Sequence, residues 1–458
     1  MLEKEINFEE AFKVADEAIF AQSGKHISDI EMKIFRGAWQ DKTYEQIAEN
    51  TEYAANYLHR MVGKKFWDRL SDALGEKVSK KNFKTALQRR WQMSQESVDR
   101  SFIATPTEAI ATPCLEFSEG TVPLNSPFYV QRHPIEERCQ QAIAQPGALL
   151  RIKAPQQMGK TSVLDRILDR ARNANYRTVT LSFDLADSTV FTDLRKFLQW
   201  FCASVGQLCG LPNKLSEYWD DIFGCNNNTT VYFEEYILPE STTPLVLALD
   251  KVDVVFEHPE IASDFCRLLR AWYDIARRSD RRGAIWKQLR LIVVHSTEVY
   301  SGLDINHSPL ANLGAVVSLP EFTPAQVQDL AKRYGLEWES DTELQPLLDI
   351  IGGHPYLVRK AFDYLYRNRI SFLEFAAIAA TEAGPFGDHL RQHLWNLQHH
   401  PELAAAFRDV VMANKPVKIS SERAFKLYSM GLVQLQDNNV TPRFELYRQY
   451  FSVRLALT

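Results

Sequence analysis

The sequence predicts an α/β protein with a parallel sheet covered by helices, preceded by an all-α module. Beyond residue 126, short runs of β-branched residues alternate with amphipathic segments, an order typical of parallel sheets flanked by helices. Before residue 93, apolar residues recur only at helical spacing. A chain of 458 residues exceeds one hydrophobic core, so we expect several domains. They are helices at 1–92, a linker rich in Ser, Thr and Pro at 93–126, a sheet domain at 127–320 and helices beyond 321.

Composition and charge exclude several classes of protein. No run of eighteen apolar residues occurs, and the first ten residues are acidic, so we expect no membrane span, no signal peptide and a cytoplasmic location. Six cysteines at irregular spacings, without a CxxC pair, argue against a zinc site and a disulfide framework. The net charge of −5 predicts no attraction of the whole molecule to nucleic acid, so any such binding requires a local patch.

A candidate nucleic-acid interface lies in the first ninety residues. Thr43 and Gln46 have capping-box spacing at the start of a short helix. A longer helix follows a polar break at 50–53, which is the order of a helix-turn-helix whose second helix enters a major groove. We expect the apolar side of that helix to hold Tyr57, Leu58, Met61, Val62, Phe66 and Trp67, and its polar side to hold the DNA contacts Asn56, His59, Arg60, Lys64 and Lys65.

Charge supports this interface. Residues 1–55 hold six Lys and Arg against twelve Asp and Glu, whereas residues 56–92 hold ten against three. Phosphate contacts require such a local excess of cations, because counterion release supplies most of the affinity. The alternatives are a solvated helix face or a surface that docks a protein.

The central motif is a phosphate-binding loop. An apolar strand at 148–152 enters a loop that ends in Gly159-Lys160-Thr161, and an amphipathic helix leaves it. Backbone N–H groups and the helix N-terminus suit phosphate, Lys160 reaches the β- and γ-phosphates, and Thr161 offers its hydroxyl to Mg²⁺. Ala154 stands where a glycine is usual, and a chance Gly-Lys-Thr is the alternative interpretation. We predict ATP or ADP binding by Gln157, Met158, Gly159, Lys160, Thr161 and Ser162.

A second motif follows ninety residues after Lys160. The apolar strand 245–249 ends in Asp250, which we expect to hold Mg²⁺ together with Thr161. Many P-loop ATPases carry a glutamate at the next position, whereas this chain has Lys251, and an ammonium group cannot accept a proton at neutral pH. We therefore expect weak or lost hydrolysis, unless Asp253 or Glu298 substitutes as the base. Alternatively, Lys251 is a solvated residue in a family that never uses that glutamate.

A third apolar strand, 291–294, is followed by polar residues. Ser296 or Thr297 is placed to contact a γ-phosphate, although a helix N-cap is an equally simple role for Ser296. Further strands are expected at 178–183 and 315–319.

Four segments together resemble the AAA-like domain family, which is similar to the STAND branch of P-loop ATPases. They are 125–132, 154–162, 295–298 and 351–358, and the resemblance covers about 121–455. It implies an AAA/STAND-like P-loop NTPase with a helical lid at 321–385 and a winged helix at 386–458 that clamps the nucleotide domain. Residues 1–92 separately resemble the helix-turn-helix of vWA-MoxR-associated proteins.

The resemblance also assigns residues to the nucleotide base. Tyr129 and Arg132 match the segment that lines the adenine side, and Gly353-His354-Pro355 matches a lid motif whose proline packs on the base. Alternatively, Gly353 only ends a helix and Pro355 only begins one. A structural role is expected for His354. Lys251 departs from the family pattern.

Three functions are consistent with these motifs and with the resemblance. The first is a STAND-type switch that couples ATP or ADP to DNA or a partner protein through the helix-turn-helix. The second is a homo-oligomeric ATPase that remodels DNA or a protein complex. The third is a transcription factor with a relic P-loop. The second requires an arginine supplied by another copy, for which the candidates are Arg267, Arg270, Arg281 and Arg282.

Overall fold

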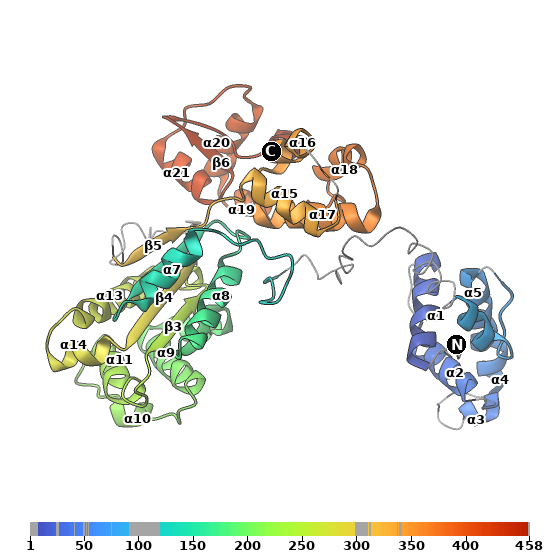
Figure 1. Ribbon diagram of the computed structural model, residues 1–458, viewed down its shortest axis with the longest axis horizontal. Coiled ribbons are helices and arrows are strands. Elements are labelled where there is room, and N and C mark those ends of the chain that lie inside the picture. The colour runs from blue at the N-terminus through green and yellow to red at the C-terminus, as the bar shows by residue number, and fades with distance from the viewer. Residues whose placement is uncertain are drawn as a thin grey trace, which may run out of the picture. The chain divides into compact units, whose positions relative to one another are not determined.

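The computed structural model describes residues 8–23, 27–40, 42–48, 51, 53, 55–74, 76–90, 120–297, 310, 313–336, 338 and 341–456. Contacts within the chain define two compact units, Met1–Ala111 and Thr112–Thr458. The described part of the first unit is helical, and the second contains the sheet (Figure 1).

The N-terminal unit is a helical bundle closed by aromatic side chains. Thr43 N–H donates to Gln46 Oε1 at 2.9 Å and Gln46 N–H donates to Thr43 Oγ1 at 3.3 Å, which confirms the predicted capping box. The Phe35 ring lies at the centre and contacts Phe8, Phe12, Trp39, Phe66 and Phe83. The elements are α1 (Phe8–Ser23), α2 (Asp29–Trp39), α3 (Tyr44–Ala48), α4 (Ala55–Tyr57), η1 (Leu58–Gly63), α5 (Lys64–Leu74) and a helical stretch at 83–90.

The second helix of the predicted helix-turn-helix contains a π-helical segment, η1, between α4 and α5. Hydrogen bonds from i to i+5 insert extra residues into a turn, so the buried positions become Leu58 and Gly63. Tyr57 and Met61 are 46 % and 52 % exposed. The prediction that both lie on the apolar side was wrong, because it assumed an unbroken α-helical period.

The second unit contains a five-stranded parallel sheet in the order β2-β3-β4-β1-β5, which confirms the expected α/β class. Residue Ala154 pairs with Ser296, and Ser182 pairs with Asp250, so the carboxyl ends of four strands meet at one edge. Each expected strand is present within a few residues of its predicted bounds. The strands are β1 (Leu149–Ala154), β2 (Arg177–Ser182), β3 (Leu245–Asp250), β4 (Leu289–Ser296) and β5 (Ala315–Ser318).

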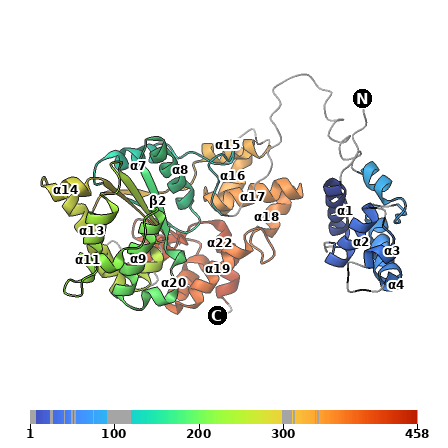
Figure 2. The ribbon, with the colours of Figure 1, turned by 90° about the horizontal axis from the view of Figure 1, so that it is seen from below.

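Helices cover both faces of this sheet (Figure 2). One face packs on α7 (Ile135–Ala144) and α8 (Lys160–Asn173) through side chains such as Ile152, Leu164 and Ile292. The other face packs on an aromatic layer that includes Phe201, Phe265 and Trp272. That layer comes from α9 (Leu194–Leu208), α11 (Cys225–Tyr232), η4 (Phe233–Ile237), α13 (Pro259–Ala276) and α14 (Arg281–Trp286). Shorter elements are η2 (Phe183–Leu185), η3 (Ser188–Thr192), α10 (Leu215–Tyr218) and α12 (Asp253–Phe256).

The segments predicted to be the lid (321–385) and the winged helix (386–458) share one hydrophobic core. Phe362 of the lid and Phe407 and Phe451 of the winged helix are all fully buried in it. Because their side chains pack in a single core, we expect these two segments to move together. The elements are α15 (Pro324–Arg333), α16 (Asp341–Ile351), α17 (Pro355–Asn368), α18 (Phe372–Ala379), α19 (Gly387–Gln398), α20 (Pro401–Met412), α21 (Ser421–Ser429), β6 (Val433–Gln436), β7 (Asn439–Pro442) and α22 (Glu445–Leu455).

Replacing Phe35 by Ala should destabilise the N-terminal unit alone. The substitution removes a fully buried ring and leaves a cavity, a change that costs about 3–5 kcal/mol. Calorimetry should show one transition moving to lower temperature and a second, from the 112–458 unit, unchanged. A single transition that shifts as a whole would show that the two units do not unfold independently.

Candidate functional site

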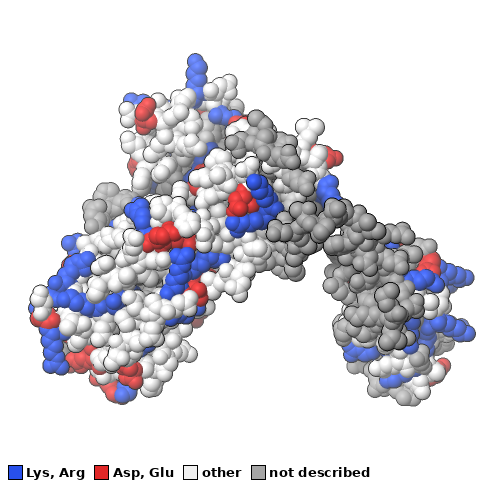
Figure 3. Space-filling view, in the orientation of Figure 1, with Lys and Arg blue, Asp and Glu red and all other residues white. Residues whose placement is uncertain are grey.

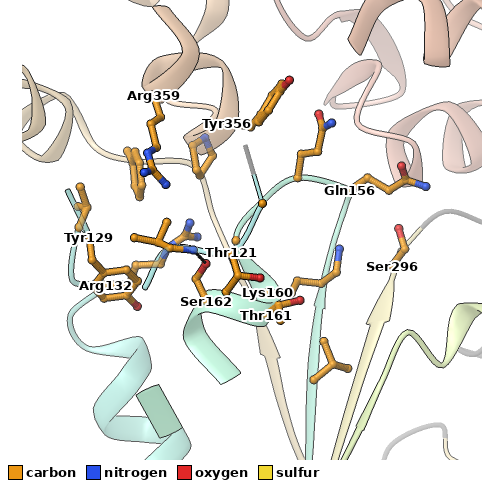
Figure 4. Close-up of a pocket in the computed structure, with 18 of the residues that line it drawn as sticks. Thr121, Tyr129, Arg132, Gln156, Lys160, Thr161, Ser162, Ser296, Tyr356 and Arg359 are labelled. Atoms are coloured by element: carbon orange, nitrogen blue, oxygen red, sulfur yellow. Dashed lines mark hydrogen bonds between the residues drawn. The ribbon is translucent and has the colours of Figure 1, made fainter. Parts of the chain in front are cut away.

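A cavity of about 720 Å³ opens at the carboxyl edge of the sheet, within the size range of ligand sites (Figure 4). It brings together segments that are far apart in the sequence: the loop after β1, the ends of β3 and β4, and the N-terminus of α17. Eleven of the predicted nucleotide, metal and catalytic residues line it. They are Tyr129, Arg132, Gln157, Gly159, Lys160, Thr161, Ser162, Asp250, Asp253, Ser296 and Pro355. Met158 does not line the cavity, because its side chain is fully buried beneath the loop.

The loop between β1 and α8 has a backbone that is suited to wrap an anion. Gly159 has a φ of +81° and caps α8, and Gln157 has a φ of +59°. The Lys160 ammonium donates to the carbonyl oxygens of Ala154 at 3.0 Å and Pro155 at 2.8 Å, so it lies across the mouth of the loop. Ala154 is buried as the last residue of β1, so the loop entry does not require the usual glycine.

Thr161 and Asp250 form an oxygen pair at the base of the cavity. The Thr161 hydroxyl donates to Asp250 Oδ2 at 3.2 Å, and the backbone N–H of Lys251 donates to Oδ1 at 3.0 Å. Burial raises the pKa of Asp250 above its ordinary value. A hydroxyl and a buried carboxylate are donors that Mg²⁺ prefers, and the cation would offset the burial of the negative charge. The residues present therefore fit the expected metal.

The residues next to Asp250 do not provide an obvious catalytic base. Lys251 has a φ of +58°, and its ammonium lies 3.7 Å from Asp184. Asp253 accepts the backbone N–H of Ser296 at 2.8 Å, which ties α12 to the tip of β4. Glu298, the other candidate base, lies outside the described residues.

Thr297 does not face the cavity. Its hydroxyl donates to the carbonyl oxygen of Ser429 at 2.7 Å, on the last residue of α21. The suggestion that Thr297 contacts a phosphate is therefore wrong, because its hydroxyl donates to a carbonyl group of α21. Ser296 lines the cavity on the side of Lys160 and Thr161 (Figure 4).

Tyr129 and Arg132 lie on the side of the cavity away from Ser296 (Figure 4). The buried Arg132 guanidinium donates to Met158 O at 2.7 Å and to Pro320 O at 3.1 Å. Burial lowers the pKa of Arg132 to about 10, so the group stays charged at neutral pH. The Tyr129 hydroxyl donates to Glu136 at 2.7 Å. Both residues shape this end of the cavity, while their polar atoms hold protein partners.

The Gly353-His354-Pro355 motif places the N-terminus of α17 beside the cavity. A Cβ on Gly353 would lie 1.9 Å from the Phe322 carbonyl oxygen, so this close approach requires glycine. His354 is buried and caps α17, and Pro355 is the first residue of that helix and lines the cavity. Gly353 therefore does more than end a helix, while the structural role expected for His354 agrees with its burial.

Sequence reasoning missed several lining residues. Residues 120–122 fall in the predicted linker, but Val122 N–H donates to the Ser162 hydroxyl at 3.0 Å and Arg166 donates to Val122 O at 3.1 Å. No periodic signal marks such a segment. Arg359 follows Pro355 by one helical turn, so its position on the same face could have been inferred from spacing. The other missed lining residues are Phe128, Gln156, Val294, Phe322, Leu330, Tyr356, Asp388 and Gln392.

The candidate nucleic-acid residues lie along one helix of the N-terminal unit. Asn56, His59, Arg60, Lys64 and Lys65 are all solvent-exposed on α4, η1 and α5. The exposed rings of Tyr53 and Tyr57 stack beside them, with centroids 5.6 Å apart. On the face of this unit seen in Figure 3, Lys and Arg predominate over Asp and Glu.

Two family models match the chain. The model of the AAA-like domain matches residues 117–453, and the model of the vWA-MoxR associated protein N-terminal HTH matches residues 6–90. A search of curated proteins found no match. Among the described residues, no helix has the length and apolar character needed to cross a membrane.

Solved structures with a similar fold are remote in sequence. The Walker-type ATPase of Pyrococcus abyssi is 13 % identical, with 70 % of this chain and 96 % of that chain covered and a TM-score of 0.51. The ORC2 protein of Aeropyrum pernix, in its ADPNP-ADP complexes, is also 13 % identical, with 73 % and 98 % covered and a TM-score of 0.42. At this identity the first match shows a shared fold and nothing more.

Replacing Asp250 by Asn should preserve or raise the stability of the ligand-free protein and should abolish the contribution of Mg²⁺ to nucleotide binding. A carboxyl group whose pKa is raised on folding makes the native state less stable at pH values above its unfolded pKa. The ligand-free variant should therefore melt at or above the wild-type temperature at pH 7, and this advantage should vanish near pH 4. Conversely, Mg²⁺ should no longer add to the stabilisation by nucleotide.

Thermal melts between pH 4 and 8, with nucleotide plus either Mg²⁺ or EDTA, measure both effects. Asp409→Asn, at an exposed position of α20, serves as the control. An Asp250→Asn protein that keeps the full Mg²⁺ effect would show that this carboxylate is not a metal ligand.

Proposed function

Because the chain belongs to the AAA-like domain family, we propose that it is a nucleotide-binding switch of the STAND type. ATP or ADP at the loop from Gln157 to Ser162 would set the placement of the lid and the winged helix on the sheet. The helix-turn-helix would then deliver the output to DNA or to a partner protein.

The observation that carries this proposal is a direct contact between the phosphate-binding loop and the winged helix. Gln157 Oε1 lies 2.6 Å from His389 Nδ1, and Gln392 Nε2 donates to Gln156 Oε1 at 2.8 Å. The other nitrogen of the buried His389 lies 2.8 Å from the Tyr447 hydroxyl on α22. A ligand that changes the conformation of the loop would therefore alter its hydrogen bonds to α19. Through His389, the change would also reach α22.

A second junction connects the Gly353-His354-Pro355 motif to Arg443, the residue that follows β7. Glu321 forms an ion pair with Arg443 at 2.6 Å and accepts the Gly353 backbone N–H at 3.1 Å. The ion pair is largely shielded from water, so it is screened less than a surface pair. A ligand that packs on Pro355 would thus act on the lid and the winged helix together.

The chemistry proposed for the site is binding rather than rapid turnover. Backbone N–H groups of the loop and the Lys160 ammonium would neutralise the phosphates, and Thr161 and Asp250 would hold Mg²⁺. Bound Mg²⁺ would supply charge neutralisation between the phosphates. Lys251 cannot take a proton from water at neutral pH, and Asp253 already accepts a hydrogen bond from Ser296. Slow hydrolysis follows.

The two alternatives have weaker support. Three of the candidate arginines for an oligomeric ATPase hold partners within this chain: Arg267 with Asp264, Arg270 with Asp274 and Arg282 with Glu234. The alternative of a transcription factor with a relic P-loop does not explain why Lys160, Thr161 and Asp250 line an open cavity.

Nucleotide binding should require Lys160 and should reach the winged helix through Gln157. Lys160→Ala should weaken binding of ATP and ADP by at least about tenfold in calorimetric titration, because the phosphates lose their ammonium partner. In the wild type, nucleotide should change amide hydrogen exchange in α19 and α22. Gln157→Asn tolerates the positive φ but is too short to reach His389, so it should bind nucleotide with a smaller change in α19.

The proposal fails if the wild-type protein binds neither nucleotide. It also fails if nucleotide binds but leaves the exchange of α19 and α22 unchanged in both proteins. Size-exclusion chromatography with and without ATP separates the oligomeric alternative, which requires a larger assembly.

DNA as the output target predicts a salt-dependent interaction. Alanines at Arg60, Lys64 and Lys65 should weaken binding to duplex DNA and reduce the slope of log K against log salt by roughly 0.9 per lost phosphate contact. Fluorescence anisotropy over a salt series measures the slope, and Lys415→Ala with Lys418→Ala in the winged helix is the matched control. Binding without salt dependence, or unchanged by the triple substitution, would favour a protein partner.

A further inference from the structure

Lys251 has an unusual position in the cavity. It directly follows Asp250 at the end of β3, and its φ of +58° is one that residues with a side chain rarely adopt. Such a conformation costs roughly 1–2 kcal/mol, and conformations of this kind cluster at functional sites. The side chain lines the cavity together with Lys160, Thr161 and Ser296.

The partner of Lys251 holds it only weakly. Its ammonium lies 3.7 Å from Asp184, in η2 after the neighbouring strand β2, and about half of each side chain is exposed. Exposed pairs of this kind contribute between zero and about 1 kcal/mol. The ammonium can therefore leave Asp184 for a more highly charged anion at little cost.

The position of Lys251 along the cavity indicates which anion its ammonium would bind. Thr161 and Asp250, the pair suited to Mg²⁺, lie 3.2 Å apart beside Lys251, and in P-loop proteins this metal bridges the β- and γ-phosphates. The residue after Asp250 therefore borders the end of a triphosphate chain rather than the base. A flexible four-carbon side chain with three donors suits a terminal phosphate as a point charge.

We propose that Lys251 is a ligand of the γ-phosphate that makes the site distinguish nucleoside triphosphates from diphosphates. In the triphosphate state the ammonium leaves Asp184 and neutralises the terminal phosphate; in the diphosphate state it stays with Asp184. Lys251, which occupies the position of the usual catalytic glutamate, thus also responds to the presence of the third phosphate. This inference rests on the nucleotide binding proposed above.

Binding measurements with a non-hydrolysable ATP analogue and with ADP test this role. Lys251→Met keeps most of the side-chain length and loses the charge, so affinity for the analogue should fall by about tenfold while affinity for ADP stays within about twofold. Asp184→Asn releases the ammonium and should raise affinity for the analogue severalfold, with ADP again unchanged. Lys214→Met is the matched control, since Lys214 forms a comparable exposed pair with Glu217 at 3.9 Å and does not line the cavity.

The outcomes distinguish this inference from the proposed function. Equal loss of both ligands in Lys251→Met, or an unchanged affinity for the analogue, overturns the role of Lys251 while nucleotide binding stands. Failure of the wild-type protein to bind either ligand overturns both proposals. Because Asp184→Asn shifts affinity in the opposite direction, loss of folding in one variant cannot imitate the expected pattern.

Discussion

The rest of the structure depends on the parallel register of the central sheet. Because Ala154 pairs with Ser296 and Ser182 with Asp250, the loop after β1 and the ends of β3 and β4 meet at one edge. In open α/β sheets, ligands bind outside this carboxyl edge. A shift of one residue in β1 or β3 would separate Thr161 from Asp250 and turn the side chains of that strand toward the wrong layer.

A second constraint lies where α19 meets the loop between β1 and α8. His354, His389 and His393 are buried there, and burial lowers the pKa of each below its ordinary value. A neutral imidazole has one donor and one acceptor, which matches the two partners of His389, Gln157 and Tyr447. The junction is thus polar but uncharged.

Much of the fold could be predicted because its signals are local. The five strands are buried apolar runs, the Thr43–Gln46 capping box needs only two residues at the correct spacing, and Gly-Lys-Thr at the start of α8 marks the loop. The predictions that failed depended on non-local packing. Tyr57 and Met61 became exposed through a π-helical segment that no periodicity shows, and Thr297 turned toward a helix 132 residues later in the sequence.

The sequence by itself determined the order of elements, the candidate phosphate and metal ligands, and the lysine that stands in place of a catalytic carboxylate, because each follows from residue type at a fixed spacing. Tertiary structure decided how these parts meet. It enclosed the cavity with 120–122, Arg359 and α19, gave Arg132 a carbonyl partner in the loop and joined Gln157 to His389. Such contacts form between segments distant in the chain, and their energy depends on the packing of the complete core rather than on any local pattern.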